Sequence, residues 1–321
     1  DSLQDLHQIA VVLWRHGFSW PAKAREETRA TATIKESADS SGRNTVEYGH
    51  AQRLAPPHMG GYTPHMRAII LGAGRGSRLK ALTDNQPKPY APIGDHRILD
   101  WLLASLTAAG VDDIVFVGGY RIDLVQRDYP QLRFRHNQNW SETNILASLM
   151  CAEDCMDDGF VVTYADILYR HDVVRRAIDH PGDRVLCVDT DWRSRYVDRS
   201  QHPEDDAEKV IARGDQVLQV NRTIDSDAAH GEYIGVARFS NTGAQSLRAA
   251  YHSIRQEQDG QPWKGGVPFH KAYLIHLYEE MLDAGHDFHM VTTNGQYMEV
   301  DTEEDFLQAN QQWPAAEQMH P

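Results

Sequence analysis

Cysteine is scarce in this sequence. Its 321 residues include three cysteines, Cys151, Cys155 and Cys187. So few thiols, in an odd number, exclude a disulfide framework and indicate a reducing compartment, so we expect a cytoplasmic protein. The spacing of Cys151 and Cys155 predicts two half-buried positions one turn apart on a helix.

Long apolar runs are also missing. No stretch of about 18 apolar residues occurs, so no transmembrane helix is expected. The sequence opens with the acidic residues Asp1 and Asp5 and lacks the basic flank of a secretory signal. Because it does not begin with Met, we expect a processed or trimmed chain.

Positive charge is in deficit. The chain has 32 Lys and Arg residues against 46 Asp and Glu residues, a formal net charge of −14. An acidic surface argues against nucleic-acid or membrane partners. An anionic ligand would therefore need local basic groups that hold it against the field of the whole protein.

The first 65 residues differ from the rest. After a short apolar stretch, "LHQIAVVLW", they are polar, rich in turn formers and without apolar periodicity. This composition predicts a disordered or loosely attached extension over residues 1–65. Met66 then opens a clear strand and could be the natural start. We expect one domain over residues 66–313 and a flexible tail over 314–321.

An alternation of strands and helices follows Met66, which predicts an α/β fold with a mostly parallel mixed sheet flanked by helices. The apolar, β-branched stretches predict buried strands, and the amphipathic stretches predict helices. The expected strands are 67–72, 113–119, 132–137, 159–166 and 184–189, and the expected helices are 97–110, 141–155 (opened by Ser141) and 172–179.

The last third of the chain has a different rhythm. The stretch 207–222 predicts a hairpin that turns at Gly214-Asp215, and 231–240 predicts another strand. Thr302, followed by acidic residues, predicts the capped start of a closing helix. The remaining expected elements are helices near 242–256 and 269–285 and strands over 288–293 and 296–301.

The stretch "ILGAGRGSRL", residues 69–78, places glycines at positions 72, 74 and 76. One interpretation is a strand-to-helix turn that uses glycine for backbone freedom. A dinucleotide site is a second, but it needs G-x-G-x-x-G and an acidic residue after the next strand, where Gly118-Gly119 stand. A Walker loop is excluded because no Gly-Lys-Ser/Thr follows. The third is a nucleoside triphosphate site with main-chain N–H groups facing the phosphates.

Basic residues next to the glycines favour the third interpretation. Arg75 and Arg78 could meet phosphates with charge-assisted hydrogen bonds. Lys88 lies between two prolines, which hold its backbone extended. A rigid lysine near a phosphate loop suits the stabilisation of charge on a phosphoryl group in transfer.

The stretch "MRAIILGAGRGSRLKALTDNQPKPYAPIGDHRILDWLLASL" closely resembles the signature of the sugar-phosphate nucleotidyltransferase superfamily. That signature is a strand, G-x-G-x-G-x-R-L, a variable loop, P-K and a helix. The resemblance runs from Met66 to about Trp313. It implies a Rossmann-like core and an enzyme that exchanges the pyrophosphate of a nucleoside triphosphate for a phosphorylated acceptor.

The resemblance also implies roles for individual residues. Arg78 matches the arginine that binds the triphosphate, and Lys88 matches the lysine that contacts the α-phosphate and the acceptor. These two are the predicted catalytic residues. The residues that match the nucleotide-cradling loop are Leu71, Gly72, Ala73, Gly74, Arg75 and Gly76.

The reaction needs a divalent cation, which we expect to be Mg²⁺, on carboxylate oxygens. Asp166 ends one predicted strand and Asp301 ends another, at the two places where the superfamily carries its metal carboxylates. Asp301 could instead only cap the closing helix. The Asp-x-Asp at 189–191 resembles the metal site of nucleotide-sugar glycosyltransferases, an alternative from a different class, but Asp189 is better placed to line the acceptor pocket.

Three further stretches, "HNQNWSETNILASLMCA", "YMEVDTEEDF" and "VDTDWRSRYVDRSQHPEDDAEKV", resemble the branch that cytidylylates phosphocholine and small phosphonates. This resemblance implies CTP as the donor and an aminoethyl-, hydroxyethyl- or carboxyl-phosphonate as the acceptor. Hexose-1-phosphate and phosphocholine remain alternative acceptors. Asn139 and Asn144 are candidates to pair with the cytosine edge, although Asn144 could bond locally at a helix start.

The four cationic side chains of the segment Trp192–Lys209 form a basic island in an acidic protein, as a phosphonate dianion would require. A solvated loop with ordinary surface charges is the alternative. The predicted acceptor-binding residues are Asp189, Arg195, Arg199 and Lys209, and the island also contains Arg193 and His202.

We expect direct displacement, in which the acceptor oxygen attacks the α-phosphorus of CTP and pyrophosphate leaves toward Arg78. No general base is needed, because the acceptor oxygen is ionised near neutral pH. A non-catalytic nucleotide-sensing relative would have lost Lys88 or a metal aspartate, and all three residues are present. A homodimer is possible.

Overall fold

The computed structural model describes residues 66–319 except 198, 202 and 259–261. The chain divides into two units, Asp1–Thr63 and Pro64–Pro321, and only the second is described here. The predictions for residues 1–65 and for His202 therefore lie outside the described residues. In the described part, no helix is both long enough and apolar enough to cross a membrane.

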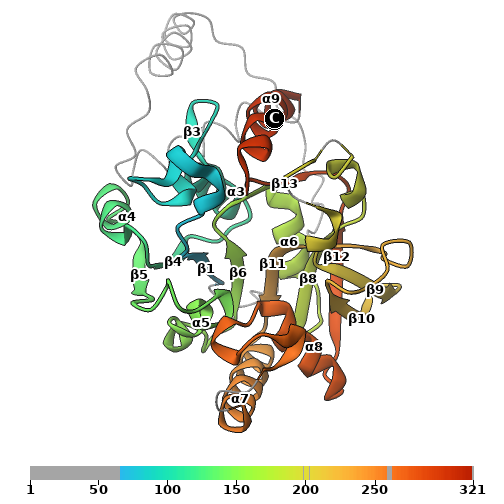
Figure 1. The fold of residues 1–321 in the computed structure, drawn as a ribbon. Coiled ribbons are helices and arrows are strands. Elements are labelled where there is room, and N and C mark those ends of the chain that lie inside the picture. The colour runs from blue at the N-terminus through green and yellow to red at the C-terminus, as the bar shows by residue number, and fades with distance from the viewer. Residues whose placement is uncertain (1–65, 198, 202, 259–261, 320–321) are drawn as a thin grey trace, which may run out of the picture. The chain divides into compact units, whose positions relative to one another are not determined.

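A nine-stranded sheet forms the centre of the second unit (Figure 1). From one edge to the other its strands are β5 (Arg133–His136), β4 (Asp113–Gly118), β1 (Arg67–Gly72), β6 (Phe160–Tyr164), β11 (Gly231–Phe239), β8 (Arg184–Asp189), β12 (Phe288–Thr293), β10 (Gln216–Asn221) and β9 (Lys209–Arg213).

Strand direction matches the sequence-based expectation. The β5–β4, β4–β1, β1–β6 and β8–β12 ladders are parallel. Strand β11 is antiparallel to both β6 and β8, and β10 is antiparallel to β12 and β9. All strands except β10 and β11 thus run the same way, which confirms the mostly parallel mixed sheet.

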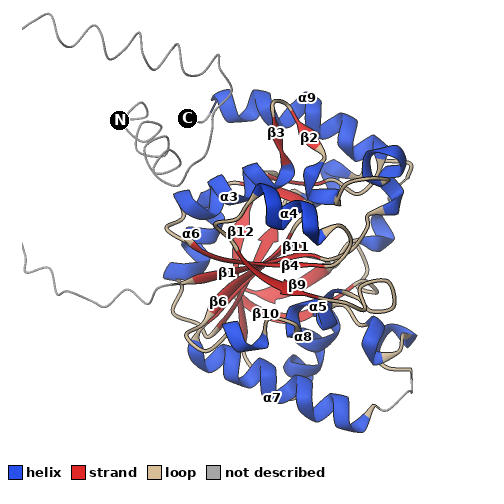
Figure 2. Ribbon diagram, turned by 90° about the vertical axis from the view of Figure 1, so that its left-hand side faces the viewer, coloured by secondary structure: helices blue, strands red, loops and turns tan. Residues whose placement is uncertain are grey.

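Helices cover both faces of the sheet, with α3, α4, α6 and α9 on one side and α5, α7 and α8 on the other (Figure 2). Because both faces are covered, every residue of β8 and β11 is buried, as their apolar sequences predict. The helices are α3 (Ile98–Ala108), α4 (Ile122–Asp128), α5 (Ile145–Met150), α6 (His171–Asp179), α7 (Asn241–Glu257), α8 (Leu274–Asp283) and α9 (Glu303–Met319).

Helix boundaries differ from the prediction at both ends of α5 and at the end of α9. The helix expected to open at Ser141 begins at Ile145, because the Asn144 side chain accepts the N–H of Ile145 at 2.8 Å and caps α5. It ends at Met150, so Cys151 and Cys155 do not share a helix; Cys155 ends the separate 3₁₀ helix Glu153–Cys155. The closing helix α9 extends beyond the predicted end at Trp313 to Met319.

A small two-stranded sheet brings the two predicted metal carboxylates together. Strand β13 (Tyr297–Glu299) pairs antiparallel with β7 (Ile167–Tyr169), and the N–H of Val300 donates to the carbonyl of Asp166 at 2.9 Å. Asp166 directly precedes β7, and Asp301 lies just beyond β13. Residues 135 positions apart in the sequence are thereby neighbours.

Candidate active site

A cavity of about 480 Å³ opens at the carboxyl ends of β1 and β6, where ligands bind in open α/β sheets. Most of the residues that sequence reasoning assigned to the nucleotide, the chemistry and the metal line it. They are Leu71, Gly72, Ala73, Gly74, Gly76, Arg78, Lys88, Asn144, Asp166 and Asp301.

The glycine loop needs glycine for two separate reasons. A Cβ on Gly72 would lie 2.5 Å from the ring of Phe116, so the strand end packs only without a side chain. Gly76 has φ +69°, and a Cβ there would lie 2.6 Å from Cδ of Lys88. The loop therefore leaves room for the stem of Lys88. Arg75 does not line the cavity and pairs with Asp84 at 2.9 Å.

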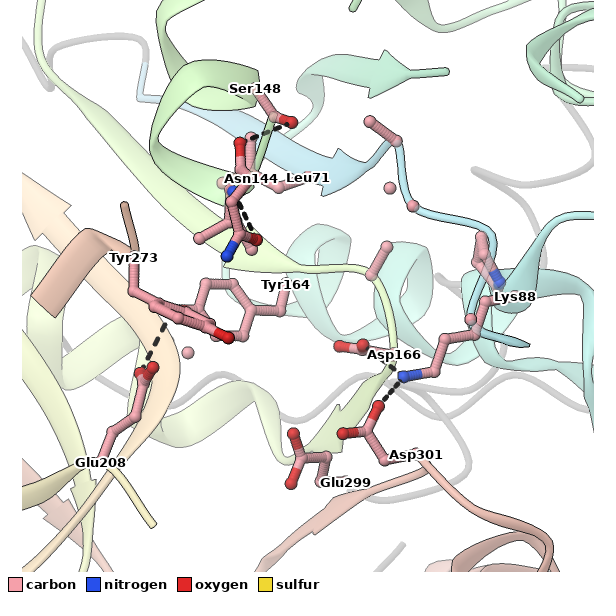
Figure 3. A pocket seen from close by; sticks show the side chains of 18 of the residues that line it. Leu71, Lys88, Asn144, Ser148, Tyr164, Asp166, Glu208, Tyr273, Glu299 and Asp301 are labelled. Carbon is pink, nitrogen blue, oxygen red and sulfur yellow. Dashed lines mark hydrogen bonds and ion pairs between the residues drawn. The ribbon is translucent and has the colours of Figure 1, made fainter. Parts of the chain in front are cut away.

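Lys88 lies between two carboxylates (Figure 3). Its Nζ donates to Oδ2 of Asp166 at 2.6 Å and to Oδ1 of Asp301, and its side chain is 8% exposed. Burial alone would lower the pKa of Lys88, but the charges of Asp166 and Asp301 outweigh burial and raise it. The ammonium is therefore a permanent cation. Arg78 donates to the other oxygen of Asp301.

Thr302 takes the capping role that the sequence left open for Asp301. Helix α9 is capped by Thr302, whose hydroxyl accepts the N–H of Asp305 at 3.2 Å. The Asp305 carboxylate accepts the N–H groups of Asp301 and Thr302 at 3.1 and 2.9 Å. The side chain of Asp301 instead faces Lys88 and Arg78.

The aspartate pair fits a divalent cation. The two carboxylates meet at the Nζ of Lys88, Asp301 also pairs with Arg78, and Oδ1 of Asp166 is buried with no hydrogen-bond partner among the described residues. Carboxylate oxygens are the ligands that Mg²⁺ prefers. Asp166 and Asp301 are thus the residues that would hold it.

Sequence reasoning missed a third carboxylate in this corner, Glu299, which also lines the cavity. Burial raises its pKa well above the usual range, and the negative charges of Asp301 and Asp166 add to the effect. A signal was available, because Glu299 precedes Asp301 by two residues at the end of a strand, where alternate side chains share a face.

The two residues predicted to contact the nucleoside, Asn139 and Asn144, differ in their position relative to the cavity. Asn144 lies beside Leu71 and Ser148 at the cavity wall (Figure 3), but its amide donates to the carbonyl of Lys271 at 3.1 Å and caps α5, as the local alternative predicted. Asn139 is exposed and does not line the cavity.

A residue that sequence reasoning missed, Asn137, holds two polar groups of the cavity wall in place. It is 4% exposed, and its amide donates to the hydroxyls of Thr143 and Ser148 at 2.9 and 3.0 Å. Thr143 and Ser148 both line the cavity. Its position one residue beyond β5 gave no sequence signal that separated it from an ordinary loop asparagine.

The Asp-x-Asp pair closes a loop and does not face the cavity. Oδ1 of the buried Asp189 accepts the N–H groups of Asp191 and Gly295 at 3.0 and 2.7 Å. Oδ2 of Asp191 accepts the Ser194 hydroxyl at 3.1 Å. Neither aspartate lines the cavity, so the geometry disfavours both the glycosyltransferase alternative and the predicted acceptor role of Asp189.

The described cations of the predicted basic island do not line the cavity either. Arg195 is buried and pairs with Glu232, with Asp189 3.5 Å away. Arg199 pairs with Asp305 at 2.7 Å. These partners lie far away in the sequence, so the pattern of charges could not reveal them. The third predicted acceptor-binding cation, Lys209, is 2% exposed and donates to the carbonyl of Arg222 at 2.9 Å.

Other residues line the far end of the cavity, where Glu208 lies near Tyr164 and Tyr273 (Figure 3). Glu208 accepts the Tyr164 hydroxyl at 3.2 Å and pairs with Arg222 at 3.3 Å. Burial raises the pKa of Glu208 to about 7, although the charge of Arg222 acts against this. No motif singled these residues out.

Comparison with known families agrees with this geometry. Residues 68–253 match the MobA-like NTP transferase domain. The chain belongs to this family. The predicted nucleotidyltransferase is thereby confirmed as the class of enzyme, and so is the resemblance to the sugar-phosphate nucleotidyltransferase superfamily.

The chain is similar to several characterised cytidylyltransferases. It is 27% identical over 246 residues to the CTP:phosphoglutamine cytidylyltransferase of Campylobacter jejuni, a match that covers 74% of this chain and 96% of that enzyme. It is 27% identical over 138 residues to the 2-aminoethylphosphonate cytidylyltransferase of Lancefieldella rimae, which covers 38% of this chain and 56% of the relative.

Solved structures share the fold. The CTP:phosphocholine cytidylyltransferase from Streptococcus pneumoniae superposes with a TM-score of 0.59 at 19% identity, over 77% of this chain and 98% of that one. The inositol-1-phosphate CTP transferase from T. maritima gives 0.59 at 18% identity, over 78% and 97%. At such identities the likeness confirms the Rossmann-like fold class.

Proposed function

We propose that this enzyme transfers the CMP group of CTP to the phosphonate or phosphate oxygen of a small acceptor, with release of pyrophosphate. The observation that carries the proposal is the contact of Lys88 with Asp166 and Asp301 directly beside the glycine loop. This corner combines main-chain N–H groups, two cations and a pair of carboxylates, which are the groups that phosphoryl transfer requires.

The mechanism is a direct displacement. An acceptor oxygen attacks the α-phosphorus, the bond from the α-phosphorus to the bridging oxygen breaks, and pyrophosphate leaves with both electrons toward Arg78. Lys88 donates to the α-phosphate oxygens and stabilises the charge that develops on them. Mg²⁺, held by Asp166 and Asp301, would neutralise the phosphate charge.

CTP is the proposed donor because the Campylobacter relative, which matches 74% of this chain with 96% of its own length, is named for CTP. Leu71, Asn144 and Ser148 line the part of the cavity beside the glycine loop, where the base would lie.

The proposed acceptor is a small phosphonate or phosphate ester that carries an amine. Acidic side chains and tyrosines line the cavity beyond Lys88, and together they favour a cationic group over ring hydroxyls. This revises the sequence argument, which placed a dianion on the basic island. The acidic residues are Asp206 and Glu208, since Glu232 already pairs with Arg195 and Glu299 lies in the corner of Asp166 and Asp301.

A pyrophosphate-release assay tests the proposal. CTP, UTP, dTTP and ATP are each combined with aminoethylphosphonate, hydroxyethylphosphonate, phosphocholine and glucose-1-phosphate. We expect the highest kcat/KM for CTP with an amine-bearing acceptor. If UTP or dTTP with a hexose-1-phosphate is the best pair, the cytidylyl and acceptor assignments are wrong, while the family assignment stands.

A further inference from the structure

We propose that Arg222 and Glu208 form a subsite for the charged head of an α-amino acid, so that the acceptor is an amino acid with a phosphonate or phosphate at its far end. The inference rests on the proposed function and narrows it. Arg222 would bind the carboxylate of the acceptor, and Glu208 would bind its ammonium group. Both residues line the same cavity as Lys88.

Arg222 is prepared to bind a carboxylate. Its guanidinium carbon lies 4.1 Å from the ring centre of Tyr273, which fixes the plane of the group. Its Nε is buried and has no hydrogen-bond partner among the described residues. A planar guanidinium with unused donors is the group that binds a carboxylate through two parallel hydrogen bonds.

Glu208 is prepared to bind an ammonium group. It is 7% exposed, and the Tyr164 hydroxyl donates to Oε2 at 3.2 Å. Its contact with Arg222 is long, at 3.3 Å from Oε1 to the guanidinium nitrogen, so Oε1 can accept a second donor. A buried carboxylate that makes only two such contacts with the described part of the chain still has room for a cation.

Charge balance favours a zwitterion over a plain amine. Arg222 and Glu208 form a neutral pair, and an amino-acid head group is neutral as well, so each charge on one side meets an opposite charge on the other. An acceptor with the ammonium group alone would add a net positive charge beside Arg222 and leave the donors of Arg222 unused. Buried charges are costly unless they are paired and hydrogen-bonded.

Other charged groups near this end already have partners. Glu232 accepts from Arg195 and from the Tyr196 hydroxyl, at 2.7 Å in the latter case. Lys209 donates to the carbonyl of Arg222 and so holds the backbone of that residue in place. These contacts leave the two sides of the Arg222–Glu208 pair as the complementary surface for the head group.

The test compares acceptors that differ only in the carboxylate. Phosphonoalanine is paired with aminoethylphosphonate, phosphonohomoalanine with aminopropylphosphonate, and O-phosphoserine with phosphoethanolamine. In the wild-type enzyme with CTP, we expect the amino-acid member of at least one pair to have a kcat/KM higher by about tenfold or more, as for a paired charge in a buried site.

Variants assign the preference to the two residues. Arg222→Met should remove the preference for the carboxylate by raising KM for the amino acid, and Arg222→Lys should restore part of it. Glu208→Gln should raise KM for amine-bearing acceptors both with and without the carboxylate. Arg193→Met is the matched control, because Arg193 pairs with Asp227 at 2.8 Å and does not line the cavity. Thermal melting of each variant verifies that it is folded.

Two different failures can be told apart. If CTP is used but both members of every pair react equally well, or Arg222→Met keeps the preference, the subsite is refuted and the proposed function stands. If no amine-bearing acceptor releases pyrophosphate from CTP while a hexose-1-phosphate with another nucleotide does, the proposed function is refuted, and the subsite with it.

Discussion

Lys88 pairs with two aspartates and supplies positive charge for the proposed reaction. Lys88→Ala should lower kcat by about 10²-fold or more, because one preorganised charge donor in a transition state contributes about that much. The measurement is steady-state pyrophosphate release. Lys80→Ala is the control, since Lys80 is exposed and pairs with Glu303. Near-normal turnover of a folded Lys88→Ala protein would remove Lys88 from the chemistry.

Glu208 should make stability depend on pH. Its pKa in the folded protein is raised from 4.5 to about 7, mainly by burial. A carboxyl group with a higher pKa in the folded than in the unfolded state reduces stability as the pH rises through that interval. Glu208→Gln removes the ionisable group, so the Tm of the variant relative to that of wild type should be higher at about pH 8 than at about pH 5.

Melting curves at the two pH values check this prediction. Glu153→Gln serves as the matched control, because Glu153 is partly exposed and lies away from the cavity. An equal Tm difference at both pH values would mean that Glu208 keeps an ordinary pKa in the folded protein.

At the residue scale, some site residues could be predicted from the sequence and others could not. The structure brings together Lys88, Asp166 and Asp301, which could be singled out because each lies in a local pattern, a Pro-Lys-Pro or a strand end, that has a chemical meaning on its own. Arg195 and Arg199 were misassigned because their charges are matched by Glu232 and Asp305, which lie distant in the sequence. Whether a charge is free depends on tertiary contacts, which composition does not contain.

At the scale of the elements, the pairing of β13 with β7 brings together Asp166 and Asp301, the two residues that would hold the metal. Asp166→Asn and Asp301→Asn should each abolish Mg²⁺-dependent activity, because a neutral amide is a poor ligand for a hard cation. Activity is measured over a Mg²⁺ titration, with Asp189→Asn and Asp191→Asn as controls. If those two controls lose activity while Asp301→Asn keeps it, the metal lies at the Asp-x-Asp loop.

Gly76 positions the element that carries Lys88. Alanine there must adopt φ +69° and place its Cβ 2.6 Å from Cδ of Lys88. Gly76→Ala should therefore lower both Tm and kcat by displacing the lysine stem. A Cβ on Gly74 would meet nothing within 4 Å, so Gly74→Ala should keep its Tm. Equal melting temperatures of the two variants would show that the Lys88 stem does not depend on Gly76.

Strand positions were the most predictable elements, since the apolar runs of β1, β6 and β8 correspond to strands buried on both faces. The start of α5 was wrong by four residues. Ser141, Thr143 and Asn144 are all acceptable helix caps, and the sequence alone does not decide among them. The structure selects Asn144, because its amide also reaches the carbonyl of Lys271 on a distant segment.

At the scale of the whole molecule, all residues placed in the proposed chemistry fall between Leu71 and Asp301, within the unit Pro64–Pro321. The Campylobacter relative matches 74% of this chain with 96% of its own length. A chain that starts at Met66 should therefore fold and keep the full kcat/KM of the complete protein. Expression, thermal melting and the pyrophosphate assay on both proteins measure this.

A chain that starts four residues later, at Ile70, is the control for this comparison. Beginning at Ile70 removes Ile69, which is fully buried, and Arg67, whose guanidinium donates to Asp113 at 2.8 Å and to the carbonyl of Cys155 at 2.7 Å. Those bonds tie β1 to β4 and to the segment before β6, so this shorter protein should melt at a lower temperature or fail to accumulate. If the Met66 protein behaves as badly, residues upstream of Met66 contribute to the fold or the site.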